Sequence, residues 1–139
     1  MFALQAEATF DAAHFLQGHK GACRNLHGHR WRVVLEIEGM EPQPGGPARD
    51  MLLDFADVKH TLRELAAGLD HKLIYEAGSL RPQTVAALKD EGFALVEMPF
   101  RPTAERLSEW FYHKLAAAGI APARVWVYET PENCAAYWE

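Results

Sequence analysis

The sequence is poor in cysteine and has no long apolar run. Its 139 residues include two cysteines, Cys23 and Cys134, too few for the disulfide framework of a small secreted domain. No apolar stretch approaches the roughly 20 residues that span a bilayer, and Met1–Gln5 lacks the basic and then apolar pattern of a signal peptide. We therefore expect a cytoplasmic location, free thiols and no membrane partner.

Acidic residues are missing from one segment. The whole chain carries a net charge of -5, which argues against nucleic acid as a partner. Residues 12–35 nevertheless contain no Asp or Glu, and they hold these basic residues and histidines: His14, His19, Lys20, Arg24, His27, His29, Arg30 and Arg32. An acid-free basic stretch in an acidic protein indicates a local anion site. Taken without any motif, a solvated basic face explains it equally well.

The remaining composition, 49% hydrophobic and 24% charged, is that of an ordinary globular protein. We expect residues 1–139 to form one domain. Alternating apolar and polar residues, or short apolar runs, predict strands at 2–10, 30–38, 51–53, 93–98 and 124–129. Helical spacing and caps predict helices after Asp54 to about 67, at 83–90, and from 102–103 to 119. The order favours an α+β fold with two main helices on one face of an antiparallel sheet.

Three histidines are candidates for a shared metal. His27 and His29 are two residues apart, so at the start of a strand both rings point to one face. His14 follows the preceding strand, whose end lies beside that start in an antiparallel pair. Three neutral imidazoles favour Zn²⁺ and leave the fourth tetrahedral position open, as in catalytic zinc sites.

Cys23 leaves two interpretations open. It precedes His27 by four residues and could close the metal site as a fourth ligand, which would make the chain a non-catalytic zinc-binding module. The flanking Gly21, Ala22 and Asn25 equally fit a loop that holds the thiol near the metal without binding it. The spacing does not decide between them.

The motifs as a set resemble one known family. They are Phe10-Asp-Ala-Ala-His14, Cys23-Arg-Asn-Leu-His27-Gly-His29-Arg-Trp31, Leu53-Asp54-Phe55 with Lys59, Leu69-Asp70-His71, Pro102-Thr103-Ala104-Glu105 and Val127-Tyr128-Glu129-Thr130. This series is similar to the 6-pyruvoyl and 6-carboxytetrahydropterin synthases over nearly the whole chain. The Cys-x-x-x-His-Gly-His element with its upstream Ala-His is the specific part, whereas Pro-Thr-x-Glu alone would be weak.

The resemblance implies a role for each matching residue. His14, His27 and His29 would hold zinc, and Cys23 would abstract a proton in a relay completed by Asp70 and His71. Glu129 would grip the pterin ring and join the relay. The expected substrate-binding set is Glu129, Thr103, Glu105 and Arg24, with Lys20, Arg30 and Arg32 as further candidates for the triphosphate.

The resemblance also implies a tunnelling fold (T-fold): a four-stranded antiparallel sheet with two helices, assembled as a homo-oligomer, trimer or hexamer, with substrate sites between subunits. The Cys-Arg-x-Leu-His-Gly-His form is more similar to the bacterial 6-carboxytetrahydropterin synthases of queuosine biosynthesis than to the pyruvoyl enzymes. It implies conversion of 7,8-dihydroneopterin triphosphate to 6-carboxy-5,6,7,8-tetrahydropterin, acetaldehyde and triphosphate. The alternative is a 6-pyruvoyl product. Two departures, Lys72-Leu-Ile-Tyr75 in place of a Leu-Asn pair and a longer segment up to Pro102, fall outside the metal motif.

Overall fold

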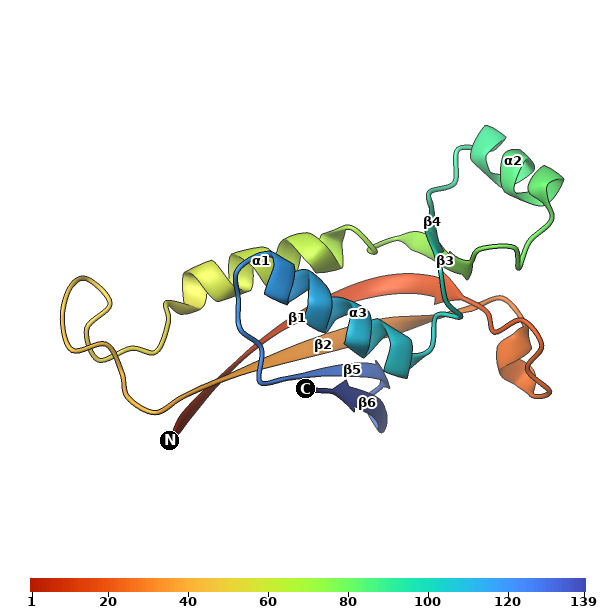
Figure 1. Cartoon of the computed structure of the whole chain (residues 1–139). Coiled ribbons are helices and arrows are strands. Elements are labelled where there is room, and N and C mark those ends of the chain that lie inside the picture. The colour runs from red at the N-terminus through yellow and green to blue at the C-terminus, as the bar shows by residue number, and fades with distance from the viewer.

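A long hairpin of two antiparallel strands forms the centre of the molecule. The computed structural model describes all 139 residues, with β1 at Phe2–His14 and β2 at His27–Gly39 (Figure 1). The pairing runs from Phe2 opposite Gly39 to His14 opposite His27. Both strands extend beyond the predicted ranges and reach the histidines, because the alternation of buried and exposed residues continues through them.

The hairpin belongs to a six-stranded sheet of order β4-β3-β1-β2-β5-β6. Strands β5 (Arg124–Thr130) and β6 (Asn133–Tyr137) extend it antiparallel on one side. Strands β1, β2, β5 and β6 are therefore the expected four-stranded antiparallel sheet. Strands β3 (Lys72–Glu76) and β4 (Leu95–Met98) add two parallel strands on the other side. The α+β class is confirmed, and the predicted strand count of four is corrected to six.

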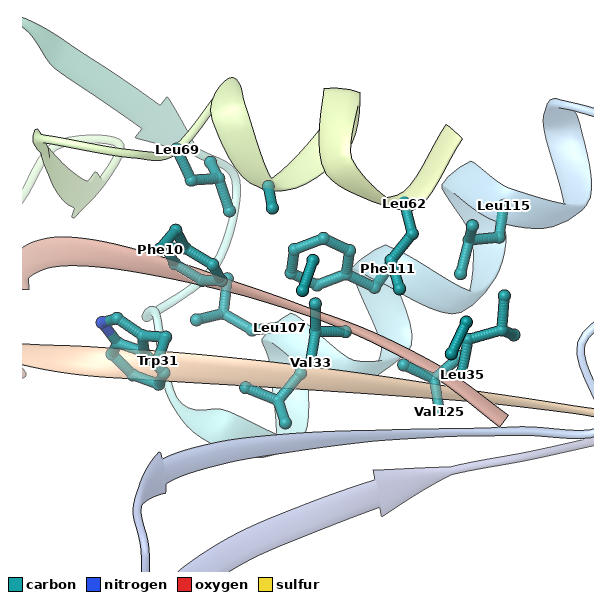
Figure 2. Packing of buried hydrophobic residues seen from close by; sticks show 14 of the residues in the cluster. Phe10, Trp31, Val33, Leu35, Leu62, Leu69, Leu107, Phe111, Leu115 and Val125 are labelled. Carbon is teal, nitrogen blue, oxygen red and sulfur yellow. The ribbon is translucent and has the colours of Figure 1, made fainter. Parts of the chain in front are cut away.

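Two helices cover one face of the sheet. Helix α1 (Phe55–Ala67) begins at Asp54, whose carboxylate accepts a hydrogen bond from the Ala56 amide at 2.8 Å. Helix α3 (Ala104–Ala117) begins at Thr103. Their apolar stripes pack on the alternate residues of β1, β2 and β5 that face them (Figure 2), and the fully buried members include Trp31, Val33, Leu35, Leu62, Leu107, Phe111, Leu115 and Val125. Burial of this surface is the main stabilising term of the fold.

The segment after α1 supplies the two parallel strands of the sheet and a third helix. It runs through β3, the short helix α2 (Pro82–Asp90) and β4, and α2 lies away from α1 and α3 (Figure 1). The predicted helix at 83–90 and the predicted strand at 93–98 are thus confirmed within two residues. The strand predicted at 51–53 is wrong, because those residues pair with no neighbouring strand.

None of the helices has the length and hydrophobicity to cross a membrane.

Candidate metal centre

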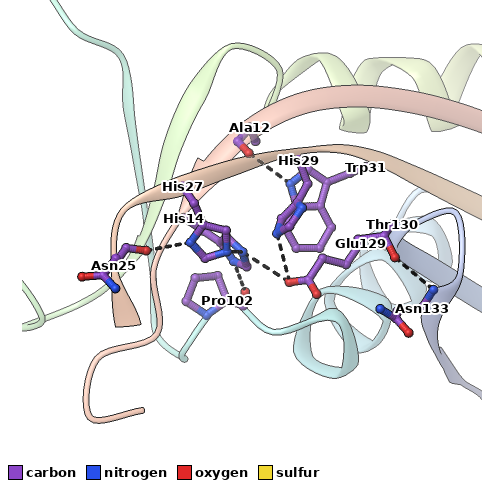
Figure 3. Close-up of polar contacts among 10 residues, drawn as sticks. All are labelled: Ala12, His14, Asn25, His27, His29, Trp31, Pro102, Glu129, Thr130 and Asn133. Carbon is purple, nitrogen blue, oxygen red and sulfur yellow. Dashed lines mark hydrogen bonds and ion pairs between the residues drawn. The ribbon is translucent and has the colours of Figure 1, made fainter. Parts of the chain in front are cut away.

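Three imidazoles and one carboxylate converge at the end of the hairpin (Figure 3). His14 is the last residue of β1, and His27 lies directly opposite it as the first residue of β2. His29 lies on the same face of β2, two residues further on. Glu129 comes from β5, where its alternation with Val125 and Val127 turns it to the same side. Four side chains from three strands therefore share the helix-covered face of the sheet.

The potential ligand atoms are close enough to share one ion. His14 Nε2 and His27 Nε2 are 3.1 Å apart. Glu129 Oε1 lies 3.3 Å from His14 Nε2 and 3.5 Å from His29 Nε2. These three separations are close to the roughly 3.3 Å expected between tetrahedral donors that lie about 2.0–2.1 Å from a common centre, and all four ligand atoms lie within 4.8 Å of one another.

The outward nitrogens of two imidazoles are held by backbone carbonyls. His14 Nδ1 donates to the Pro102 carbonyl at 2.8 Å, and His27 Nδ1 donates to the Asn25 carbonyl at 2.6 Å. In the neutral rings this fixes both lone pairs on Nε2. Two lone pairs facing each other at 3.1 Å repel unless a proton or a cation lies between them. The carbonyl partners are those that commonly orient metal-bound histidines.

Burial favours the neutral form of His14 and of His29. Desolvation lowers the pKa of His14 below its usual value, although the Pro102 hydrogen bond opposes this. Desolvation also lowers the pKa of His29, against the opposing charge of Glu129. His29 Nε2 is buried and has no hydrogen-bond partner, since its 3.5 Å contact with Glu129 is too long to count as one. A buried, neutral and unpaired imidazole nitrogen fits a metal ligand.

Trp31 forms the floor of the site. Its ring is fully buried and meets the rings of His14 and His29 edge-on, at centroid distances of 4.9 and 5.5 Å. The indole Nε1 donates to the Ala12 carbonyl at 3.2 Å, which fixes the ring between the two strands. An apolar wall beside the ligands restricts their motion and keeps water from that side.

Glu129 lies beside the imidazoles, where the sequence predicted an open fourth coordination position. From the sequence we predicted three histidines with a free fourth position and a Glu129 that grips a ligand ring. The structure brings the carboxylate within contact distance of two of the imidazoles. Separation of a hundred residues along the chain hides this proximity, and only the shared alternation with Val125 and Val127 hinted at it.

The Cys23 thiol takes no part in this cluster. Cys23 lies half-buried in a single 3-10 turn, η1 (Ala22–Arg24), within the loop that joins β1 to β2. Its sulfur is not among the grouped ligand atoms. Within the chain, the cluster of potential ligand atoms therefore contains no sulfur.

The expected substrate-binding residues are distributed around the site. Arg24 is exposed in η1, next to Cys23. Thr103 caps α3, its hydroxyl accepting from the Arg106 amide at 3.3 Å, and follows the Pro102 carbonyl that holds His14. Glu105 is exposed in the first turn of α3. None of the three is in the four-residue cluster.

Asp70 and His71 form a second polar centre. His71 Nδ1 donates to Asp70 Oδ2 at 2.8 Å, and Asp70 Oδ1 accepts from the Asp11 amide at 2.8 Å. The Asp11 amide, followed by the bond from His71, lowers the pKa of Asp70, and the bond to Asp70 raises the pKa of His71. His71 adopts a left-handed backbone with φ of 56°, a strained conformation that often marks a functional position.

A cleft lies beside this pair. Its volume is about 620 Å³, and Asp11, Arg30, His71, Leu88 and Phe93 are among its lining residues. Cys23 is not among them, and no hydrogen bond joins Cys23 to Asp70 or His71. Within one chain, the predicted relay of Cys23, Asp70 and His71 is thus not assembled.

Comparison with known proteins identifies the family of the chain. The family model for 6-pyruvoyl tetrahydropterin synthase matches residues 3–139. A 6-carboxy-5,6,7,8-tetrahydropterin synthase from Haemophilus influenzae is 33% identical over 100% of both chains. One from a Synechocystis species is 29% identical, covering 99% of this chain and 94% of the relative.

Solved structures show the same fold. An uncharacterized protein from Wolinella succinogenes superposes with a TM-score of 0.81 at 21% identity, covering 99% of this chain and 98% of the other. The 6-pyruvoyl tetrahydropterin synthase of Caenorhabditis elegans superposes with a TM-score of 0.70 at 21% identity, covering 99% and 95%. The architecture is therefore that of the T-fold pterin synthases. The chain belongs to the 6-pyruvoyl tetrahydropterin synthase family.

Proposed function

We propose that this protein is a zinc-dependent 6-carboxytetrahydropterin synthase. It would convert 7,8-dihydroneopterin triphosphate to 6-carboxy-5,6,7,8-tetrahydropterin, acetaldehyde and triphosphate, a step of queuosine biosynthesis. The observation that carries the proposal is the convergence of His14, His27, His29 and Glu129 on one point. The relatives that bear this name over the full chain length support the choice of product.

The three histidines would hold the ion. The carbonyl partners of His14 and His27 and the lowered pKa of His14 and of His29 suit a cation bound through Nε2. Zinc bound there supplies a Lewis acid for oxygen atoms of the substrate side chain. Trp31 keeps the imidazoles from turning away.

Glu129 would orient the pterin. A carboxylate can accept two parallel hydrogen bonds from the 2-amino-pyrimidinone edge of the ring. Because Glu129 lies next to the imidazoles, a ring held there presents its side chain to the metal centre. On binding, the carboxylate would exchange its contacts with His14 and His29 for contacts with the ring.

Proton transfer would use groups from two subunits. Cys23 is the proposed base, and the Asp70–His71 pair is held rigidly by the Asp11 amide, but no contact joins them within the chain. We therefore propose a homo-oligomer, trimer or hexamer, in which the pair of one copy serves the thiol of another. The edge of β1 from Phe2 to Phe10 has no strand beside it, which leaves it free for pairing between copies. Mass measurement in solution tests this.

The reaction is tested by product analysis. Purified zinc-loaded protein is incubated with 7,8-dihydroneopterin triphosphate, and the pterin product and acetaldehyde are quantified. Acetaldehyde with the 6-carboxy product is expected. Triphosphate release without acetaldehyde, giving a 6-pyruvoyl product, would replace the proposal with the activity that the family model names. No turnover of this substrate would reject both.

The Cys23→Ala variant tests whether Cys23 acts as the catalytic base while the histidines alone hold the zinc. We expect it to retain its zinc and to lose activity by at least the 10²- to 10⁴-fold that positioned acid–base groups typically contribute. Loss of zinc in this variant would instead support a structural module with a thiolate ligand. Cys134→Ala is the matched control, because Cys134 is an exposed thiol in β6, and it should retain both zinc and activity.

A further inference from the structure

The loop that carries Cys23 is tied to the metal centre at both ends. On the β1 side, the Leu16 amide, two residues after His14, donates to the Cys23 carbonyl at 2.9 Å. On the β2 side, Asn25 lies two residues before His27 and binds its ring. The η1 turn is thus bonded to the chain beside two of the proposed ligands.

Asn25 makes the connection on the β2 side. Its carbonyl accepts from His27 Nδ1 at 2.6 Å. Its backbone amide and its side-chain Nδ2 both donate to the Ala22 carbonyl at 3.0 Å. One residue therefore binds the imidazole with one group and closes the turn around Cys23 with two others. The side chain of Asn25 is exposed, so burial does not dictate these contacts.

We propose that Asn25 is a positioning residue that couples the metal centre to the Cys23 turn. The inference rests on the proposed function in one respect, since it takes His27 as a metal ligand. An ion on Nε2 makes the opposite Nδ1–H a stronger donor and fixes the ring. The carbonyl of Asn25 is then held more firmly, and the turn closed by its amide and side chain becomes more ordered.

This coupling works in both directions. If the bound ion stabilises the turn, then a stable turn raises the affinity for the ion by the same factor. Asn25 would therefore affect zinc affinity although it contributes no ligand atom. A residue that only packed the loop would change the loop without any dependence on the metal.

The test is alkylation of Cys23 with iodoacetamide at fixed pH, followed by mass spectrometry. Rates are measured with zinc bound and after chelation, in the wild-type protein, in Asn25→Ala and in Asn25→Asp, which keeps the size of the side chain and removes its donor. Cys134 serves as the internal standard, because it is exposed in β6. Gln83→Ala is the control variant, since it removes an exposed amide from α2.

In the wild-type and Gln83→Ala proteins, zinc should slow alkylation of Cys23 and leave Cys134 unchanged. In both Asn25 variants the ratio of the apo rate to the zinc-bound rate should fall toward one, by on the order of fivefold, as for loss of one neutral hydrogen bond. Zinc affinity, measured by competition with a chelator, should fall several-fold as well.

Two results would overturn the inference, and they are distinguishable. If Asn25→Ala binds zinc and speeds alkylation equally in both states, so that the ratio is unchanged, then Asn25 only packs the turn and the proposed function survives. If metal analysis finds no zinc in the wild-type protein, both the proposed metal centre and the proposed coupling are rejected.

Discussion

At the scale of single residues, the histidines of the site use their two ring nitrogens for different contacts. His14 and His27 each donate from Nδ1 to a backbone carbonyl and leave Nε2 facing the cluster. His71 is arranged differently, because its Nδ1 meets the Asp70 carboxylate and its pKa is raised. Burial thus favours the neutral form of His14, whereas the Asp70 carboxylate keeps His71 protonated to higher pH.

Replacing Asp70 by Asn should lower the pKa of His71 toward its ordinary value, because Asp70 is the main cause of its rise. The amide keeps the shape of the carboxylate but loses the charge that favours the imidazolium. Titration of the His71 ring protons by NMR measures this directly. His60 is the internal reference, because it lies on the exposed surface of α1 beside Glu64. An unchanged His71 titration would show that Asp70 does not act on the ring.

The same pair contributes to stability only in a limited pH window. The raised pKa of His71 stabilises the fold below pH 6.5, and this contribution is lost as pH rises through the folded-state value. The lowered pKa of Asp70 stabilises above pH 3.8 and is lost as pH falls. The wild-type advantage over Asp70→Asn should therefore be largest between these values. It should be small, because the His71 side chain is 78% exposed.

At the scale of elements, the start of α3 connects helix formation to the metal centre. Thr103 caps the helix, and the residue before it supplies the carbonyl that holds His14. Loss of the Thr103 cap would therefore displace the Pro102 carbonyl, and with it the ring of His14, a proposed metal ligand.

Thr103→Ala should destabilise the protein by about 1 kcal/mol, the usual effect of losing an N-cap, and should weaken zinc binding. Thr103→Ser keeps the hydroxyl and should retain both properties. Urea unfolding and zinc competition on the substrate-free protein give the two readouts. If Thr103→Ala alters only the KM for substrate, the hydroxyl binds substrate as the motif implied and its cap is dispensable.

The elements also show what the sequence can reveal. The hairpin, both main helices and β5 were predictable, because each carries a regular period of two or 3.6. Strand β3 was missed because its buried residues, Ile74 and Tyr75, are consecutive. Strand β6 was missed because small residues such as Ala135 and Ala136 give little strand signal.

The same contrast applies to the site. The three histidines were predictable because two lie at strand spacing and the third lies where an antiparallel partner must end. Their carbonyl partners were not predictable, since Pro102 lies 88 residues from His14. The separation of Cys23 from the Asp70–His71 pair was also hidden, because it depends on how the loop folds after β1.

At the scale of the whole molecule, the metal centre joins parts of the chain that are far apart in sequence. It draws on β1, β2 and β5, with a carbonyl from the turn before α3. An ion bound by the folded state alone stabilises that state by mass action.

Removal of zinc should therefore lower the thermal unfolding temperature. With zinc at about 100 times its Kd, the stabilisation is about 2.7 kcal/mol, which corresponds to roughly 5–10 °C for a domain of this size. Calorimetry with and without a chelator, at fixed protein concentration, measures the shift. The His27→Ala variant should bind zinc far more weakly and show little response to the chelator. An equal response in both proteins would place the stabilising ion elsewhere.

The register that sets His14 opposite His27 has an evolutionary consequence. The proposed metal ligands belong to the strands, whereas the proposed catalytic thiol belongs to the connection between them. Insertions or deletions in residues 15–26 can therefore change the chemistry offered to a bound molecule while the ion stays in place. By contrast, a slip of one residue between the two strands would turn a ligand to the opposite face and abolish the centre.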